Sequence, residues 1–424
     1  MQMVQVVFLT VLVFFVIVTI HEWGHMIFAK RAGILVREFA IGFGPKVFSY
    51  VRGETRYTLR LLPIGGFVRM AGEDPEMVDL QPGQTIAVRI KDGQVNKLYL
   101  DQLDLRKNVI RGEIESLDLE KELNLSLIVD EEVMKYSVHP QAMMVVKGQD
   151  IQIAPLDRQF GSKTVGQRAL AIFAGPLMNF ILAFLLFGLY IQQVGMPVDH
   201  PTYVKVGEVT AGMPAEAAQM KKGDIIDQVN GVAIGGDREK LINMIEASEG
   251  KPMDWVVTRD GEQMKLSITP VSVEGQKGGK VGIAPILPTR TATFGETVKY
   301  ASNAMVTMTK NIFEGFKQLI FGQFKLDDLG GPVRTFEVTG QFAKQGIDQL
   351  TLWTAILSLY LGIFNLLPIP ALDGSRLVFL GLEGLRGKPI DPNRESMVHF
   401  IGFAMLMLLM LAVTYNDILR LVKG

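Results

Sequence analysis

The stretch His21-Glu22-Trp23-Gly24-His25 decides the fold, because it ends an apolar run that carries no charge from Val4 to Ile20. An uncharged run of this length predicts a membrane-spanning helix, which we place at residues 1–29. On a helix the two histidines lie one turn apart on the same face, so they can hold one zinc ion while Glu22 lies beside it. The pattern is typical of a metallopeptidase, here at membrane depth.

The motif has an alternative interpretation, in which the helix ends at Ile20 and the charged cluster lies at the membrane interface. Ionisable side chains inside a spanning helix are costly and usually have a partner or a function, which favours the buried site. The run is not typical of a cleaved secretory signal, because no Lys or Arg precedes Lys30 and a small-residue cleavage site is missing. A third zinc ligand from elsewhere in the chain is needed to decide between the buried zinc site and the interfacial cluster.

The composition indicates a membrane protein with a large water-exposed part. Of the 424 residues, 48% are hydrophobic and 21% are charged, so apolar spans must alternate with soluble regions. The formal net charge of −1 gives no indication of nucleic-acid binding. The chain has no cysteine, which excludes disulfides and thiolate zinc sites and leaves histidine and carboxylate as zinc ligands.

The distribution of basic residues predicts the membrane topology. Residues 30–60 are rich in Lys and Arg, so the positive-inside bias places them in the cytoplasm and the N-terminus outside. Further spans are expected at residues 169–195, 351–374 and 397–415. We therefore expect about four transmembrane helices, with both termini extracytoplasmic and the zinc motif toward the cytoplasmic side.

Residues 30–168 are expected to form a membrane-associated, β-rich region. The segment from Tyr57 to Met70, broken at Pro63-Ile64-Gly65-Gly66, predicts a β-hairpin or a re-entrant loop that dips toward the zinc motif. Such an edge suits a peptide substrate, which can add to it as a strand, and the alternative is a surface hairpin on the headgroups. Residues 73–160 are more polar, and the alternating stretches at residues 86–90 and 150–153 predict a β-rich insert, to which the sequence assigns no chemistry.

Asn179 is the notable polar residue of the second span. It follows Gly175-Pro176, where the glycine permits close helix approach and the proline interrupts the helical hydrogen bonds. Two interpretations are open for its amide, which needs a partner in hydrocarbon. Asn179 either joins two helices or contacts the substrate or the oxyanion of the reaction.

Residues 202–288 form a soluble unit that resembles the core of bacterial PDZ domains. The stretch from Gly212 to Gly231 predicts a turn, a short helix, a tight turn and a strand. Further strands are expected around residues 204–209, 255–259 and 264–268. Such domains bind extended peptides or act as a steric gate. Residues 293–345 then show apolar side chains at helical spacing, which predicts an amphipathic helical region on the outer face.

Asp373 is the candidate third ligand. It ends the stretch Asn365-Leu366-Leu367-Pro368-Ile369-Pro370-Ala371-Leu372-Asp373, which follows an apolar run from Thr351. Two prolines so close together cannot continue a regular helix, so the backbone must be extended here. A carboxylate at the end of a span is costly, and coordination of zinc resolves that cost. His399 in the last span is the competing ligand, but it lacks this loop-breaking context.

The motifs occur in order along most of the chain. They are His21-Glu22-x-x-His25, Gly65-Gly66-Phe67, Gly175-Pro176 with Asn179, one PDZ domain, and Asn365-x-x-Pro368-x-Pro370-x-x-Asp373-Gly374. Together they resemble the site-2 protease family of intramembrane zinc metalloproteases, and most of all its bacterial branch that cleaves anti-sigma factors, as found in Bacillus and its relatives. The β-rich insert is longer than in proteobacterial members, which usually carry two PDZ domains.

The resemblance implies a multi-pass protein of the bacterial plasma membrane that holds one catalytic zinc ion through His21, His25 and Asp373. Glu22 would act as the general base on the attacking water. The expected substrates are single-span membrane proteins, either anti-sigma factors or signal-peptide remnants, trimmed beforehand by another protease and cut within or near the spanning segment. The candidate substrate contacts are Gly65, Gly66, Phe67, Asn179, Asn365, Pro368 and Pro370.

Two other classes of function remain open at this point. A PDZ-containing membrane scaffold with a structural zinc site predicts that Glu22→Gln leaves the function intact. A metal-dependent transporter is suggested by the polar breaks in two spans, but the separate inverted halves common in such folds are not evident.

Overall fold

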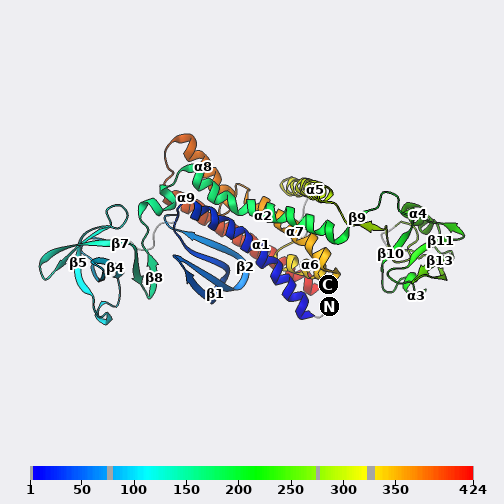
Figure 1. Ribbon diagram of the computed structural model, residues 1–424, viewed down its shortest axis with the longest axis horizontal. Helices are drawn as coiled ribbons and strands as arrows, with labels where there is room; N and C mark the ends of the chain where they lie inside the picture. Colours follow the sequence, from blue (N-terminus) through cyan, green and yellow to red (C-terminus); the bar gives the residue numbers. More distant parts are fainter. Residues whose placement is uncertain (1–2, 74–79, 274–276, 322–329, 424) are drawn as a thin grey trace. The chain divides into compact units, whose positions relative to one another are not determined.

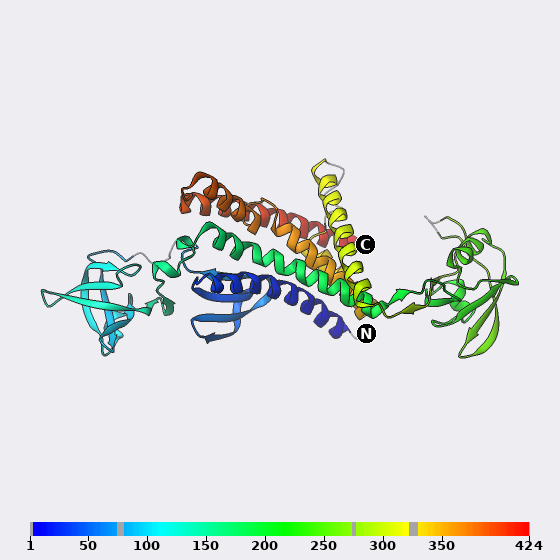
Figure 2. The ribbon, with the colours of Figure 1, turned by 45° about the horizontal axis from the view of Figure 1, so that its top comes forward.

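The computed structural model describes residues 3–73, 80–273, 277–321 and 330–423. The chain divides into two compact units, one of Met1–Phe187 with Ala301–Gly424 and one of Gly188–Tyr300. Figures 1 and 2 show long helices and two separate β structures in the first unit, and a small mixed domain in the second.

Four of the described helices are long and apolar enough to span a membrane, as the sequence predicts. The spans are α1 (Met3–Arg31), α2 (Val165–Val194), α7 (Ile347–Asn365) and α9 (Pro392–Lys423). Even α7, which has 19 residues, falls within the length that crosses a hydrocarbon layer. The chain is therefore a polytopic α-helical membrane protein.

The hairpin after α1 is larger than the sequence predicted. Strand β1 (Val36–Arg52) pairs antiparallel with β2 (Thr55–Met70), and the turn between them lies at Gly53-Glu54. The interpretation of residues 57–70 as a hairpin or re-entrant loop was wrong, because these residues form a single strand. The glycines bend this strand instead of ending it, and Gly65 has a φ of +81°.

This bend folds β2 around β1. Ile41 of β1 pairs with Leu59 on one side and with Gly66 on the other. The last part of β2, residues 66–70, therefore lies next to the start of β1 as the outer segment of a small folded sheet. Figure 1 shows this hairpin beside α1.

The predicted β-rich insert is a closed β-barrel. Strand β4 pairs with β3 on one side and with β7 on the other, which closes the ring. Its core consists of fully buried aliphatic side chains such as Leu98, Ile114 and Leu127. The elements are β3 (Thr85–Lys91), β4 (Gln94–Tyr99), η1 (Leu103–Leu105), β5 (Ile110–Asp118), β6 (Asn124–Val129), β7 (Glu132–Val146) and β8 (Gln149–Gln152), and the 3-10 helices η2 (Leu156–Arg158) and η3 (Phe160–Ser162) lead to α2.

The second unit contains the PDZ-like core. Its sheet has the order β14-β13-β11-β10-β15, with Trp255 fully buried at the centre of the hydrophobic core. The elements are β10 (Val204–Val209), α3 (Pro214–Ala217), β11 (Ile225–Val229), β12 (Val232–Ala233), α4 (Arg238–Ala247), β13 (Met253–Arg259), β14 (Glu262–Ile268) and β15 (Ile283–Ile286). The three strands expected from the sequence are confirmed. A short ribbon of β9 (Met196–Pro197) and β16 (Thr289–Arg290) flanks this core in the sequence.

The expected amphipathic region contains two helices, α5 (Phe294–Ile320) and α6 (Pro332–Gln345). The predicted interruption starts at Leu329, which lies outside the described residues. Helix α6 packs against α1 and α9, and the carboxylate of Asp417 on α9 accepts hydrogen bonds from the backbone N–H groups of Gly331 and Arg334. Because this carboxylate caps its first turn, α6 belongs to the helix bundle.

The third span is interrupted where the two prolines predict a break. Helix α7 stops at Asn365, and the chain stays non-helical until α8 (Asp373–Arg386) begins. Pro368 and Pro370 occupy this break, and neither has a backbone N–H to continue a helix. The segment 351–374 thus contains most of α7, the break and the first two residues of α8, which Asp373 opens.

Candidate metal centre

Close contacts between α1 and α2 fix the histidine face of α1. Gly24 lies against the backbone of Ala174, and a Cβ at Gly24 would overlap that carbonyl group. Gly175 faces the ring of His25, and a Cβ at Gly175 would overlap Nε2. The three polar side chains of the motif are less than 9% exposed. The two imidazoles can occupy these positions because both contact points are glycine.

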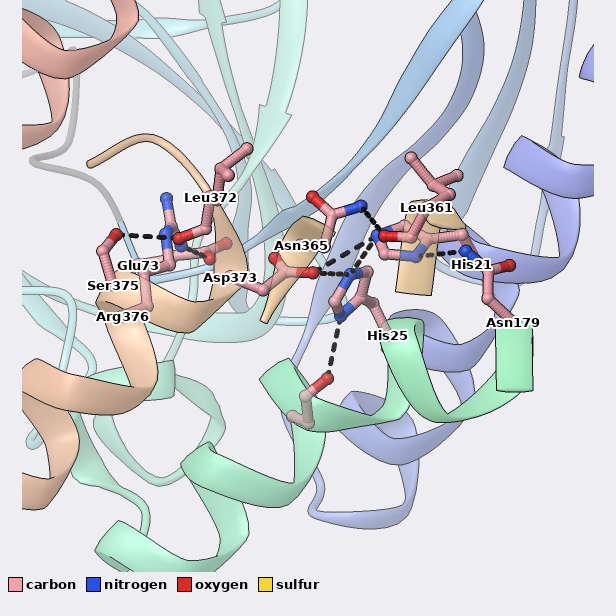
Figure 3. Close-up of polar contacts among 11 residues, drawn as sticks. His21, His25, Glu73, Asn179, Leu361, Asn365, Leu372, Asp373, Ser375 and Arg376 are labelled. Carbon is pink, nitrogen blue, oxygen red and sulfur yellow. Dashed lines mark hydrogen bonds and ion pairs between the residues drawn. The ribbon is translucent and has the colours of Figure 1, made fainter. Parts of the chain in front are cut away.

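Asp373 completes a triangle of possible ligand atoms, shown in Figure 3. Its Oδ2 lies 3.3 Å from His21 Nε2 and 3.4 Å from His25 Nε2, and the two Nε2 atoms are 3.2 Å apart. Ligands bound tetrahedrally at about 2.0–2.1 Å from zinc lie about 3.3 Å from one another, so the triangle fits three corners of a zinc site. Asp373 Oδ2 is buried and accepts no hydrogen bond from the described residues, as expected of a metal ligand.

Each histidine is oriented by a contact through Nδ1. His25 Nδ1 lies 2.9 Å from the carbonyl oxygen of Ala171 and donates to it, which leaves Nε2 for the metal. His21 Nδ1 lies 3.2 Å from Asn179 Nδ2, and if Nε2 is left for a metal, Nδ1 carries the ring proton and two donors face each other. Exchange of the two amide atoms, whose assignment is a choice of orientation, brings Oδ1 against the His21 N–H group. That exchange also satisfies Oδ1, which otherwise has no partner among the described residues.

The three ligand residues border a cavity of about 430 Å³. Glu22 lines the same cavity, as the general base of a hydrolase must. The other lining residues come from β2 and its C-terminal extension, from α2, and from the break and helix that follow α7: Gly66, Phe67, Val68, Arg69, Met70, Glu73, Ile172, Asn365, Ala371 and Arg376. Three candidate ligands beside an open cavity match the pattern of a catalytic zinc site, because a structural site is closed by four protein ligands.

Residues 66–70 form one wall of this cavity. Phe67 pairs with Ala40 of β1 on one side, and among the described residues the other side of this segment has no strand partner. Gly66 lies close to Glu22, because a Cβ at Gly66 would lie 2.8 Å from Glu22 Cγ. This part of β2 therefore offers a free backbone edge beside the metal ligands.

Besides Arg69 of β2, the cavity is lined by two charged residues that were not predicted from the sequence, Glu73 and Arg376. Arg376 forms an ion pair with Glu73, which follows the end of β2 (Figure 3). Arg376 lies one turn after Asp373 on α8, so both side chains share one face of that helix. This three-residue spacing is the one signal in the sequence that points to Arg376, whereas Glu73 is brought to the site by the fold of β2.

The remaining predicted site residues fall into two groups. Phe67, Gly66 and Asn365 line the cavity, and the amide of Asn365 donates to the carbonyl oxygen of Leu361 at 3.1 Å. Gly65, Asn179, Pro368 and Pro370 lie outside the lining. His399, the competing ligand, is not part of the ligand triangle, since its Nδ1 accepts a hydrogen bond from the backbone N–H of Ala371.

Comparisons with known proteins indicate the family of the chain. A model of peptidase family M50 matches residues 9–409, a range that contains all three ligand residues. The zinc metalloprotease RasP of Geobacillus kaustophilus is 46% identical over 416 residues, which is 96% of each chain. The regulator of sigma-W protease RasP of Bacillus subtilis is 43% identical over 423 residues, which is 99% of each chain. A PDZ domain of an SdrC-like protein from Listeria monocytogenes aligns at 19% identity with 20% of this chain and 88% of its own, with a TM-score of 0.19.

Proposed function

Because the chain belongs to peptidase family M50 and is a site-2-type zinc metalloprotease, we propose that one zinc ion held by His21, His25 and Asp373 serves peptide hydrolysis within the membrane. The observation that carries the proposal is the triangle of ligand atoms, which lie 3.2 to 3.4 Å from one another. The open cavity beside these ligands distinguishes the site from the structural zinc site of a scaffold.

The chemical role of each residue of the site follows from its position beside the ligand atoms. Zinc supplies a water of lowered pKa and polarises the scissile carbonyl. Glu22 takes the proton of the attacking water and passes it to the leaving amine. The carbonyl of Ala171 and the amide of Asn179 hold the two imidazoles so that each Nε2 faces the metal. Asn179 thus acts on His21 and not on the substrate.

The substrate binds as an extended strand along residues 66–70. A helical peptide group is hydrogen-bonded and shielded, so the substrate must unwind before attack, and a free strand edge replaces the bonds that it loses. Phe67 and Asn365 both line the cavity and contact the bound substrate. Gly65 acts indirectly by bending β2. The break between α7 and α8 owes its shape to Pro368 and Pro370, which also act indirectly.

The substrates are single-span membrane proteins of the anti-sigma factor or signal-peptide remnant class, trimmed first by another protease. The relative named as a regulator of sigma-W protease supports the first class. The Lys and Arg residues between positions 30 and 60 favour a cytoplasmic location for that region. By the same reasoning both termini and the PDZ-like unit are extracytoplasmic, and cleavage takes place toward the cytoplasmic side.

The test uses the purified full chain in detergent with a single-span test substrate. Glu22→Gln is expected to keep its zinc and to lower the cleavage rate by at least 100-fold, because it removes the general base alone. Asp373→Asn is expected to lose both zinc and cleavage. Unchanged cleavage by Glu22→Gln would rule out the proposed mechanism, whereas full zinc content in Asp373→Asn would remove Asp373 from the ligand set.

A further inference from the structure

The break between α7 and α8 contains a strained residue close to the third ligand. Ala371 has a φ of +77°, in the left-handed region where an alanine Cβ is crowded by its own backbone. Only Leu372 separates it from Asp373, and Ala371 itself lines the cavity. A residue other than glycine keeps such a conformation only when its surroundings hold it there. The direction in which Asp373 leaves the break therefore depends on what holds Ala371.

His399 of α9 makes the contact that holds it. The backbone N–H of Ala371 donates to His399 Nδ1 at 3.1 Å. Helix α9 also approaches the break one turn later, where a Cβ at Gly402 would overlap Pro370. The imidazole packs edge-on against Phe379 of α8, with ring centroids 5.7 Å apart. The ring thus contacts both the break and α8.

The tautomer of His399 follows from these contacts. Because Nδ1 accepts from Ala371, the ring carries its proton on Nε2. Nε2 is buried and lies 3.7 Å from a carboxylate oxygen of Glu395, one turn earlier on α9. At this distance the negative charge of Glu395 favours a proton on Nε2 without a hydrogen bond, and Nε2 has no hydrogen-bond partner among the described residues.

We propose that His399 is a positioning residue of the zinc site, which holds Ala371 in its left-handed conformation and so directs Asp373 toward the metal. His399 is not itself a ligand. The inference rests on the proposed ligand set of His21, His25 and Asp373. It explains why a polar residue occupies this place on an apolar helix, and why α9 must be docked for the third ligand to be in place.

The experiment measures the zinc affinity of the purified full chain by competition with a chelator, together with the cleavage rate. His399→Leu keeps much of the ring volume but cannot accept a hydrogen bond, and its zinc affinity is expected to fall about 10–100-fold. His399→Gln offers an amide oxygen to Ala371 and should stay within a few-fold of the wild type. The glutamine amide can replace the lost hydrogen-bond acceptor, but it cannot restore a lost packing contact of the imidazole ring.

A second substitution tests directly whether His399 acts by holding the backbone conformation of Ala371. Glycine adopts positive φ without strain, so Ala371→Gly in the His399→Leu background should recover zinc affinity by about tenfold. The control is Ala404→Gly in the same background, because Ala404 lies in the regular helix α9 and a glycine there should recover nothing. Failure of both His399→Gln and Ala371→Gly to restore zinc affinity would reduce His399 to a packing residue and overturn the proposal.

Asp373→Ala, measured in parallel, separates this proposal from the ligand set on which it rests. If Asp373→Ala loses zinc while His399→Leu binds it as tightly as the wild type, only the role of His399 is overturned. If Asp373→Ala binds zinc with wild-type affinity, the ligand set is wrong and the positioning role falls with it.

Discussion

Glycine residues leave the space that the side chains of the proposed zinc site occupy. Gly24 and Gly175 allow α1 and α2 to approach until the ring of His25 fits between them, and Gly66 leaves room for Glu22 against β2. At these three positions the addition of one methyl group displaces a ligand, the general base or a backbone carbonyl. The glycines are therefore as necessary to the site as its histidines, although they contact neither metal nor substrate.

Gly175→Ala is expected to lower both zinc affinity and cleavage about 10–100-fold, because its Cβ must displace the ring of His25. The matched control is Gly166→Ala on the same helix, where a Cβ meets no atom within 4 Å. Zinc titration and cleavage assays measure both variants. Equal behaviour of the two variants would show that helix packing tolerates the methyl group without moving His25.

At the scale of elements, an ion pair joins the strand that we propose binds the substrate to the helix that carries the third ligand. Glu73 extends from the end of β2, and Arg376 lies on α8 one turn after Asp373. The pair therefore fixes the free edge of β2 relative to the metal. A shift of the peptide by about 1 Å can cost 10²-fold in rate, so this link bears on catalysis without taking part in it.

Charge reversal at this pair is expected to affect turnover more than zinc binding. Arg376→Glu or Glu73→Arg alone brings like charges together, and each should lower kcat/KM by about tenfold or more with the zinc content kept. The double reversal should recover most of this loss, as a double-mutant cycle shows for directly coupled residues. Lys97→Glu, which breaks an exposed ion pair with Asp150 in the barrel, is the control. Additive losses in the double variant would mean that the two side chains act separately.

Local spacing explains which elements of the site could be predicted from the sequence. His21 and His25 are one turn apart on any helix, and the two prolines before Asp373 require a break, so the ligands follow from short-range rules. The course of β2 could not be predicted in this way, because its bend places Gly66 beside Ile41 through pairing across the hairpin. The contact of His399 with Ala371 likewise joins two segments that are distant in the sequence, and no local pattern predicts it.

At the scale of the whole molecule, the first unit contains a link between the hairpin and the barrel. Glu54 in the hairpin turn pairs with Arg158 through two hydrogen bonds of 2.6 and 2.7 Å. It also accepts from the side-chain amides of Gln152 and Gln141 on the barrel strands. The Arg158 guanidinium, helped by the two amides, lowers the pKa of Glu54 from 4.5 to about 2. The Glu54 carboxylate thus links the hairpin turn to the barrel strands and to η2.

This link predicts an acid-dependent loss of stability. Because the pKa of Glu54 is lower in the folded chain than in the unfolded chain, its contribution is complete above about pH 4.5 and is lost as the pH falls toward 2. The difference in Tm between wild type and Glu54→Gln in detergent should therefore be largest near pH 7 and shrink below pH 4.5. Glu54→Gln with Arg158→Gln should be no less stable than either single variant. A Tm difference that is constant from pH 7 to pH 3 would contradict the link.

The distribution of the zinc ligands along the chain has a consequence for biosynthesis. His21 and His25 are made about 350 residues before Asp373, and the helix that carries His399 is made after Asp373. At about 5–20 residues per second, translation takes tens of seconds to connect the two ends of the site. A nascent chain that has entered the membrane therefore carries the histidines but no complete ligand set. A chain that stalls before Asp373 therefore lacks the proposed third ligand, and we expect it to cleave membrane proteins only after α8 and α9 have been made.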